Sequence, residues 1–219
     1  QKRSMGENKK EKEMRKLCFL SAVLCCTTGF AQMAVRVGAG ATISSMTLRQ
    51  TWDLLDDKVV TYNASVSMDY LQRKYFYLSS EFKYLQFGGD DHELYSIGTT
   101  GHDLKGLPEP ETWSYLQLNT KFRARIPYGD YSIYAGIGPH ANLLAGNRHF
   151  NLRDGFGDSQ ARKFLWGEIF ELGLTYTYNK VLFDLNASYQ LNNSPIVDDA
   201  PYTFYNRIWG VNLSVGYIF

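Results

Sequence analysis

The sequence predicts an all-β fold, an eight-stranded antiparallel up-and-down barrel that follows a secretory signal peptide. Apolar and polar residues alternate with a period of two in eight segments between residue 33 and the C-terminus, as β-strands require. The links between these segments are alternately short and long, as in a meander whose two ends face different surroundings. A brief apolar run behind basic residues precedes the first segment, as in an exported protein.

The composition of this chain of 219 residues is compatible with a single exported domain. Lys and Arg number 23 and Asp and Glu 22, a net charge of +1, so no nucleic-acid partner is expected. No run of about 18 apolar residues is present, and an ordinary transmembrane helix is therefore not predicted.

Residues 1–31 are predicted to be an N-terminal extension followed by a signal peptide. Basic residues next to Met14 precede a short apolar run and then small residues before Gln32, which is the pattern of a cleavable signal. We expect translation to start at Met14, cleavage to follow Ala31, and the mature barrel domain to span 32–219.

The three cysteines, Cys18, Cys25 and Cys26, all lie in this signal segment. A lipid anchor needs a small residue before the modified cysteine, but Leu24 precedes Cys25, so lipidation is disfavoured. Cleavage leaves a mature domain without a disulfide, a thiol nucleophile or a thiolate metal ligand. No cofactor is expected, and His92, His102 and His149 are too isolated to predict a metal site.

The strands and their connections follow from the alternation. The predicted strands are 33–48, 61–71, 75–87, 112–126, 131–144, 164–178, 181–192 and 205–219. The short links are 72–74, 127–130 and 179–180, and the long links are 49–60, 88–111, 145–163 and 193–204. An even number of strands places both ends of the domain on the side of the short turns.

The composition of the two strand faces decides which face lies inside. In strand 181–192, Phe183 and Leu185 lie on one face, and Asp184 and Asn186 lie on the other. The polar faces combine charged residues with glycine, serine and threonine, which suits a crowded interior. A soluble barrel would bury the apolar face, whereas a membrane barrel turns it toward lipid. The pattern favours the transmembrane barrel.

Strand 112–126 fixes the register. Lys121, Arg123 and Arg125 lie on one face, and Leu118 and Phe122 lie on the other. A shift of one residue would turn three cations toward lipid. Each cation would then destabilise the barrel by about 2–4 kcal/mol near the bilayer midplane.

Aromatic residues are predicted to form two girdles at the membrane surfaces. The girdle residues are Tyr62, Trp166 and Trp209 at the long-loop side and Tyr70, Phe76, Tyr131, Tyr176, Tyr178, Tyr217 and Phe219 at the short-turn side. Trp113 is a partial exception, because its parity places it with the polar face, and a bulge or a loop position would explain it.

Nine ionisable residues share the inward parity. They are Arg36, Lys83, Lys121, Arg123 and Arg125 among the bases and Asp69, Glu81, Glu171 and Asp184 among the acids. Because charges held away from water must be paired, this near-balance predicts a filled, salt-bridged lumen. A narrow ion pore is the alternative, and it would leave an excess of one sign.

The last strand carries alternating apolar residues up to a terminal aromatic residue. These residues are Val211, Leu213, Val215, Tyr217 and Phe219. They resemble the assembly signal of bacterial outer-membrane proteins, which the barrel-insertion machinery recognises, although Ser214 stands where a glycine is often found. Over 32–219 the chain resembles small eight-stranded outer-membrane barrels of the OmpA/OmpX type. The resemblance implies a monomer among outer-membrane lipids and lipopolysaccharide of a Gram-negative bacterium, with short turns periplasmic and long loops extracellular.

Three functions are compatible with such a barrel. The leading hypothesis is a non-enzymatic scaffold whose four loops serve adhesion, envelope integrity or partner contact. The second is a lipid-modifying enzyme centred on His140 with Asn142 and Glu168, although a hydrogen-bonding role for His140 in the lumen is favoured. The third is an accessory barrel of a secretion machine.

Basic residues in the third long link suggest a contact with lipopolysaccharide phosphates, and surface solubility explains them equally well. These residues are Arg148, Arg153, Arg162 and Lys163.

Overall fold

A computed structural model describes residues 33–48, 57–90, 110–146, 160–199 and 202–219. The strands are β1 Ala34–Leu48, β2 Val59–Tyr70, β3 Phe76–Gly89, β4 Glu111–Tyr128, β5 Tyr131–Leu144, β6 Phe164–Tyr178, β7 Val181–Asn192, β8 Val197–Asp199 and β9 Tyr202–Ile218. The eight predicted strands correspond to β1–β7 and β9, and those predicted at 131–144, 164–178 and 181–192 coincide with β5, β6 and β7. No helix among the described residues is long and apolar enough to cross a membrane.

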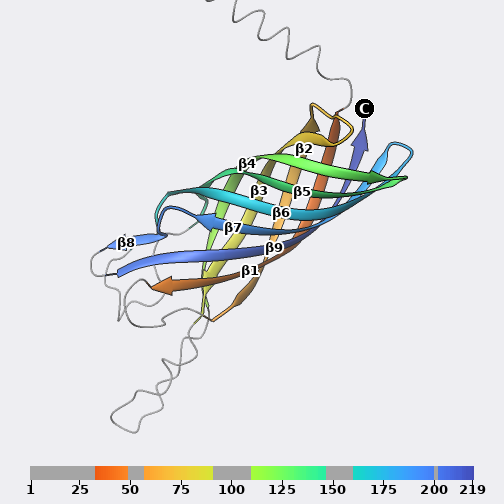
Figure 1. Ribbon diagram of the computed structural model, residues 1–219. Coiled ribbons are helices and arrows are strands. Elements are labelled where there is room, and N and C mark those ends of the chain that lie inside the picture. Colours follow the sequence, from red (N-terminus) through yellow and green to blue (C-terminus); the bar gives the residue numbers. More distant parts are fainter. Residues whose placement is uncertain (1–32, 49–56, 91–109, 147–159, 200–201) are drawn as a thin grey trace, which may run out of the picture.

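The eight long strands form a closed antiparallel barrel. Each of β1–β7 pairs with its neighbour in sequence, β9 pairs with β7, and β1 pairs with β9. The closing pair runs from Ala34 opposite Ile218 to Leu48 opposite Phe204 without a break. Figure 1 shows these strands wrapped around one axis. Closure leaves no long strand with a free edge, and the predicted eight-stranded antiparallel barrel is confirmed.

β8 is a short strand that the sequence pattern did not predict. It pairs with the start of β9, with Val197 opposite Phe204, and lies beside that end of β9 in Figure 1. Three residues are too few to establish a period of two. The segment therefore lay within the long link predicted at 193–204.

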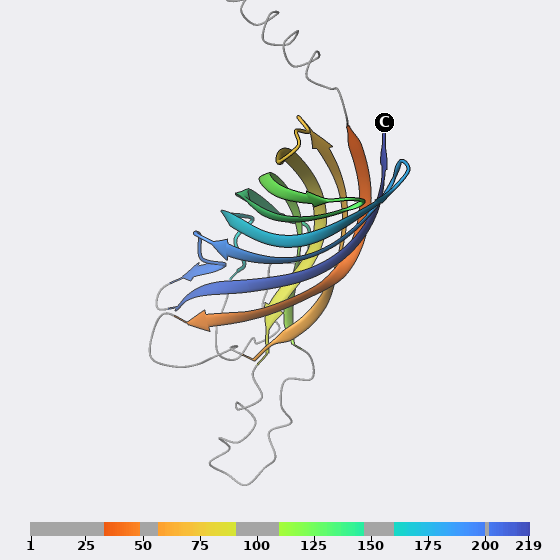
Figure 2. The same cartoon turned by 45° about the vertical axis from the view of Figure 1, so that its right-hand side comes forward.

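The short turns and both ends of the described barrel lie together. The main-chain nitrogen of Phe219 donates to the oxygen of Met33 at 2.9 Å, and that of Ile218 donates to the oxygen of Lys180 at 2.8 Å. In Figure 2 the β6–β7 hairpin lies close to the marked C-terminus. Gly129 and Asn179 begin two-residue turns with φ of 61° and 56°, a left-handed conformation that these residue types tolerate.

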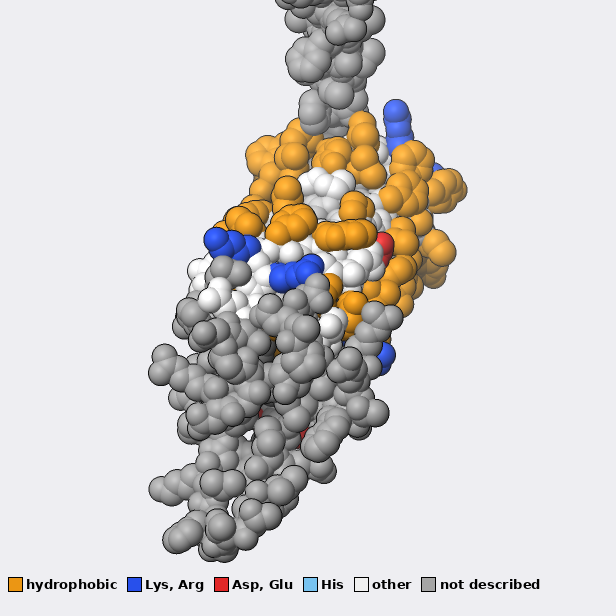
Figure 3. All heavy atoms as spheres, turned by 90° about the vertical axis from the view of Figure 1, so that its left-hand side faces the viewer, with side chains coloured by type: hydrophobic (Ala, Val, Ile, Leu, Met, Phe, Trp, Pro, Cys, Tyr) orange, Lys and Arg blue, Asp and Glu red, His pale blue; other side chains and the backbone are white. Residues whose placement is uncertain are grey.

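The barrel is apolar outside and polar over much of its inside. Leu118 is 60% exposed and Ile126 74% exposed on the outer face of β4, whereas Lys121 and Arg123 on the inner face are each 2% exposed. Figure 3 shows hydrophobic side chains gathered in a broad zone, with Lys and Arg at its border with the residues drawn in grey. The orientation of the alternating faces is that of a membrane barrel.

Candidate functional site

Eight of the nine predicted lumen residues lie buried in the interior, each at most 7% exposed. They are Arg36, Lys83, Lys121, Arg123, Asp69, Glu81, Glu171 and Asp184. Four are basic and four are acidic, so the formal charges of this ionic chain cancel. Residues from β1, β2, β3, β4, β6 and β7 contribute to it, and it therefore joins walls of the barrel that are not neighbours in the sheet.

The ion pairs form one continuous series in which the sign of charge alternates. The order is Asp184, Arg36, Asp69, Arg123, Glu171, Lys121, Glu81 and Lys83. Arg36 lies 2.7 Å from Asp69 and 3.2 Å from Asp184. Each interior charge thus has a partner of opposite sign, as burial demands.

Glu171 is the centre of this series. Its Oε2 lies 2.7 Å from Lys121 Nζ and accepts a hydrogen bond from Arg123 Nη2 at 3.0 Å, while its Oε1 accepts from Arg123 Nε. Lys121 also reaches Glu81 at 2.8 Å. A carboxylate that holds an arginine through two atoms and a lysine through a third contact fixes all three side chains.

Aromatic and glycine residues shape the space around the charges. The Arg123 guanidinium lies 4.7 Å from the ring centre of Tyr134, and the Tyr134 hydroxyl donates to Asp184 at 3.1 Å. A Cβ atom on Gly173 would lie 2.3 Å from the Tyr134 ring, and one on Gly136 would lie 2.6 Å from Glu171. These inward glycines leave room for the long side chain of the neighbouring strand.

Arg125 does not join the ionic chain. Its Nη2 and Nε donate to the main-chain oxygens of Arg73 and Lys74 at 2.7 and 3.2 Å. It lies near the short-turn end of β4, where its guanidinium stabilises the β2–β3 turn. Arg125 lies on the inward face of β4, as predicted, but its position along the barrel axis places it at the rim.

Amide side chains form a second polar layer. Gln117 donates to Asn142 at 2.8 Å and to Gln190 at 2.7 Å. His140 Nε2 lies 2.9 Å from Asn192 Oδ1. These buried side chains are uncharged amides with one histidine, and their mutual hydrogen bonds fill the interior between the ionic chain and the long-loop end.

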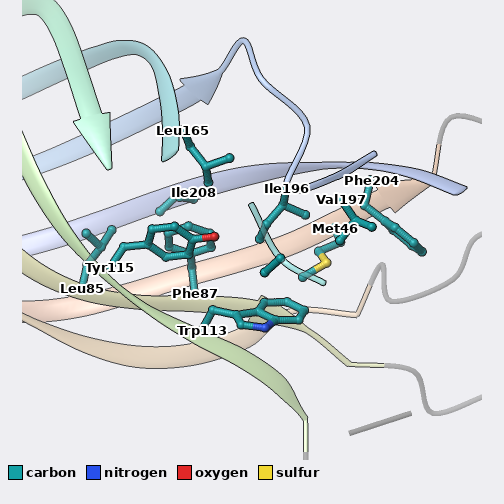
Figure 4. Close-up of a cluster of buried hydrophobic side chains, with 11 residues drawn as sticks. Met46, Leu85, Phe87, Trp113, Tyr115, Leu165, Ile196, Val197, Phe204 and Ile208 are labelled. Atoms are coloured by element: carbon teal, nitrogen blue, oxygen red, sulfur yellow. The ribbon is translucent and has the colours of Figure 1, made fainter. Parts of the chain in front are cut away.

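An apolar layer closes the interior toward the long loops. It contains Met46, Leu85, Phe87, Trp113, Tyr115, Ala161, Leu165, Ile196, Val197, Phe204 and Ile208. Figure 4 shows these side chains converging from several strands and from the β8 segment. The rings of Phe87 and Tyr115 stack with centroids 4.7 Å apart. The sequence pattern did not predict this apolar layer, because its residues lie on the strand faces that are otherwise polar.

Neither a bulge nor a loop position explains the parity of Trp113. Trp113 lies within β4 and pairs in register with Phe87, and its side chain is 3% exposed in the apolar layer. Its inward parity is therefore its real orientation. The interior simply changes from polar to apolar at this height.

The predicted girdle residues in the barrel strands lie on the outer face. Tyr62, Trp166 and Trp209 are each more than half exposed, as are Tyr131 and Tyr178. Phe76, Tyr217 and Phe219 are also exposed. Tyr70 and Tyr176 are half-buried and contact neighbours on the outer face, namely Ser80 and the ring of Tyr131.

Val211, Leu213 and Val215 are also exposed on the outer face of β9. Met14, Ala31 and Gln32 lie outside the described residues, as do Arg148, Arg153 and the three histidines of the long links.

His140 and Asn142 are neighbours that share Asn192 as a hydrogen-bond partner, but the side chain of Glu168 does not join them. His140 and Asn142 are buried in the lumen, whereas Glu168 lies outside it and accepts a hydrogen bond from Asn193 at 2.9 Å. The hydrogen-bond partner of His140 Nε2 is an asparagine oxygen, which is not a nucleophile. Within the described ranges, no group of three or more His, Cys, Asp or Glu residues is arranged to hold a metal ion.

Solved structures of small outer-membrane barrels are similar to this chain. Outer membrane protein OprG from Pseudomonas aeruginosa is 14% identical, with 86% of this chain and 95% of that chain covered and a TM-score of 0.55. Neisserial surface protein A is 12% identical, with 84% and 97% covered and a TM-score of 0.48. The N-terminal barrel domain of Pseudomonas aeruginosa OprF is 12% identical, with 85% and 97% covered and a TM-score of 0.46.

No protein-family model matches the sequence, and no curated protein matches it significantly. The fold of this chain is that of the small eight-stranded outer-membrane β-barrels. At this level of identity the likeness concerns the fold alone.

Proposed function

We propose that this chain is a non-enzymatic integral outer-membrane protein, a barrel with a filled lumen that displays four loops for adhesion, envelope integrity or partner contact. One observation carries the proposal. Apolar side chains such as Leu118 and Ile126 are exposed around the barrel, while eight charges are sealed and paired inside. In water this distribution would be unfavourable, but in a bilayer each group meets its preferred surroundings.

The lengths of the connections support the proposed orientation in the membrane. Short turns face the periplasm and long loops face the exterior in outer-membrane barrels. The surrounding lipids and lipopolysaccharide are then the immediate partners, and the apolar face of β9, with Tyr217 and Phe219, is suited to recognition by the barrel-assembly machinery. The protein would act as a monomer, because its strands close on themselves.

The filled interior predicts that the barrel does not conduct ions. The ionic chain is balanced in charge, and the apolar layer covers it on the long-loop side, whereas a pore needs a continuous wet path. Purified full-length protein reconstituted in planar bilayers should show no stable single-channel steps. Faster migration of unboiled protein in detergent gels would verify that the barrel is folded in the sample. Reproducible, well-resolved steps from folded protein would contradict the filled lumen.

The buried position of His140 predicts that lipid chemistry does not depend on it. The variant His140→Ala should leave the mass spectrum of lipid A and of phospholipids unchanged relative to cells with the wild-type protein, because His140 contacts Asn192 in the lumen. Cells that lack the protein are the control that shows whether any part of the chain takes part in lipid chemistry. A lipid species that disappears in both strains would support the enzyme hypothesis instead.

A further inference from the structure

A groove crosses the outer face of the barrel from β4 to β9. It is a cavity of about 520 Å³ lined mainly by apolar residues of β4, β5, β6, β7 and β9, together with Gly136, Glu171 and Ser188. Its floor follows one row of paired residues, in which Ala124 lies opposite Ala135, Ala135 opposite Leu172, and Leu172 opposite Ala187. Three of these four residues are alanines, which makes the row lower than the rows of larger side chains beside it, and the fourth, Leu172, stands in the middle of the floor and is exposed.

Large side chains form one wall of this groove. They are Phe122, Ile137, Phe170, Tyr189 and Trp209. Each pairs with the next across neighbouring strands, and the rings of Tyr189 and Trp209 lie 4.5 Å apart. The wall is therefore continuous across five strands, a width of about 19 Å at about 4.8 Å per strand.

A cation lies on the long-loop side of the wall, so that Trp209 stands between it and the floor of the groove. Arg207 is exposed on the same outer face of β9, two residues from Trp209 toward the long loops. Its cross-strand partners Leu191 and Ser45 are uncharged. Glu168, the carboxylate opposite Leu191, already accepts a hydrogen bond from Asn193. The guanidinium is thus placed to receive an anion at the edge of the apolar belt.

We propose that this groove binds one lipid A molecule of the outer leaflet, with a phosphate on Arg207 and an acyl chain that passes Trp209 and lies along the row of Ala187, Leu172, Ala135 and Ala124. The inference rests on the proposed function, because the long-loop end must face the outer leaflet. The charge of Arg207 matches a lipid phosphate. A flexible acyl chain fits a groove whose floor is one residue wide. The rigid surface of a second barrel would contact only the large side chains that form the wall of the groove.

Lipid retention tests the proposal. Full-length protein is inserted into nanodiscs of phosphatidylcholine with a minor fraction of hexa-acylated diphosphoryl lipid A, and bound lipids are counted by native mass spectrometry after release into detergent. Wild-type protein should retain lipid A in preference to phosphatidylcholine. Arg207→Gln should lower the retained fraction about fivefold, as expected for one cation near a phosphate. Ala187→Phe should abolish the preference by filling the groove.

Matched controls separate the groove from the rest of the surface. Ala64→Phe adds the same ring on the outer face of β2, away from the groove, and Lys180→Gln removes a charge at the short-turn end; both should retain lipid A like the wild type. Equal losses in the controls, or no preference in the wild type, would overturn the proposal. A dimer mass that Ala187→Phe removes would assign the groove to a second copy and overturn it too.

The outcome also separates this inference from the function on which it rests. Protein that inserts and migrates as a folded barrel but shows no preference for lipid A overturns the lipid site alone. Protein that does not insert overturns the membrane function and the lipid site together.

Discussion

Replacing Glu171 by glutamine should lower the free energy of unfolding by about 3–5 kcal/mol, the cost of leaving buried charges without their partner. Glu171 holds both Lys121 and Arg123 at the middle of the ionic chain. Glutamine keeps the shape of the side chain but not its charge, so two cations would face a neutral amide. Urea unfolding of the folded barrel in lipid vesicles, followed by tryptophan fluorescence, measures the change.

Glu168→Gln is the matched control for this prediction. Glu168 lies on the same strand but on the other face, partly exposed, with a hydrogen bond to Asn193. Its neutralisation should change the free energy of unfolding by no more than about 0.5 kcal/mol. Equal, small effects of the two variants would mean that water reaches the ionic chain, and the sealed interior would then be rejected.

The sequence was sufficient to predict the strands and the direction of their side chains. Alternation alone placed Asp184 inside and Leu185 outside, and the structure agrees. The reason is physical: in a barrel immersed in lipid every strand has the same two environments, so the period of two continues from the first strand to the last. Local pattern and overall fold therefore carry the same information.

Which charges meet could not be predicted, because the ion pairs depend on height as well as on parity. Arg36 on β1 reaches Asp184 on β7 across β9, a contact set by the relative positions of tilted strands. Arg125 has the correct parity but lies at the rim. The parity of a residue gives the face on which it lies, and only the three-dimensional register gives its neighbours.

The apolar layer shows a second limit of the pattern. Trp113 and Phe87 share the parity of Lys121 and Lys83 on their own strands, yet they pack with Ile196 and Val197 from the β8 segment. An interior that changes from ionic to apolar along the barrel axis breaks the rule that inward residues are polar. Only contacts between residues distant in sequence reveal that change.

An arginine in place of Leu118 should lower the free energy of unfolding by about 2–4 kcal/mol in a bilayer, because the side chain would enter the hydrocarbon. Leu118 is 60% exposed near the middle of β4, between Phe82 and Ala141 on the neighbouring strands. Its backbone hydrogen bonds and the ionic chain on the other face would be unchanged. The loss would therefore report only what surrounds the outer face.

Ile126→Arg provides the comparison on the same strand and face. Ile126 is 74% exposed close to the short turn, at the depth where an arginine reaches headgroups and costs about 0–1 kcal/mol. Unfolding in vesicles should rank the variants by depth, with Leu118→Arg the less stable. In water both positions would be exposed surface, and both substitutions would be nearly neutral. Equal stability of the two variants would thus show that no hydrocarbon layer surrounds the barrel, whereas a difference that follows depth requires one.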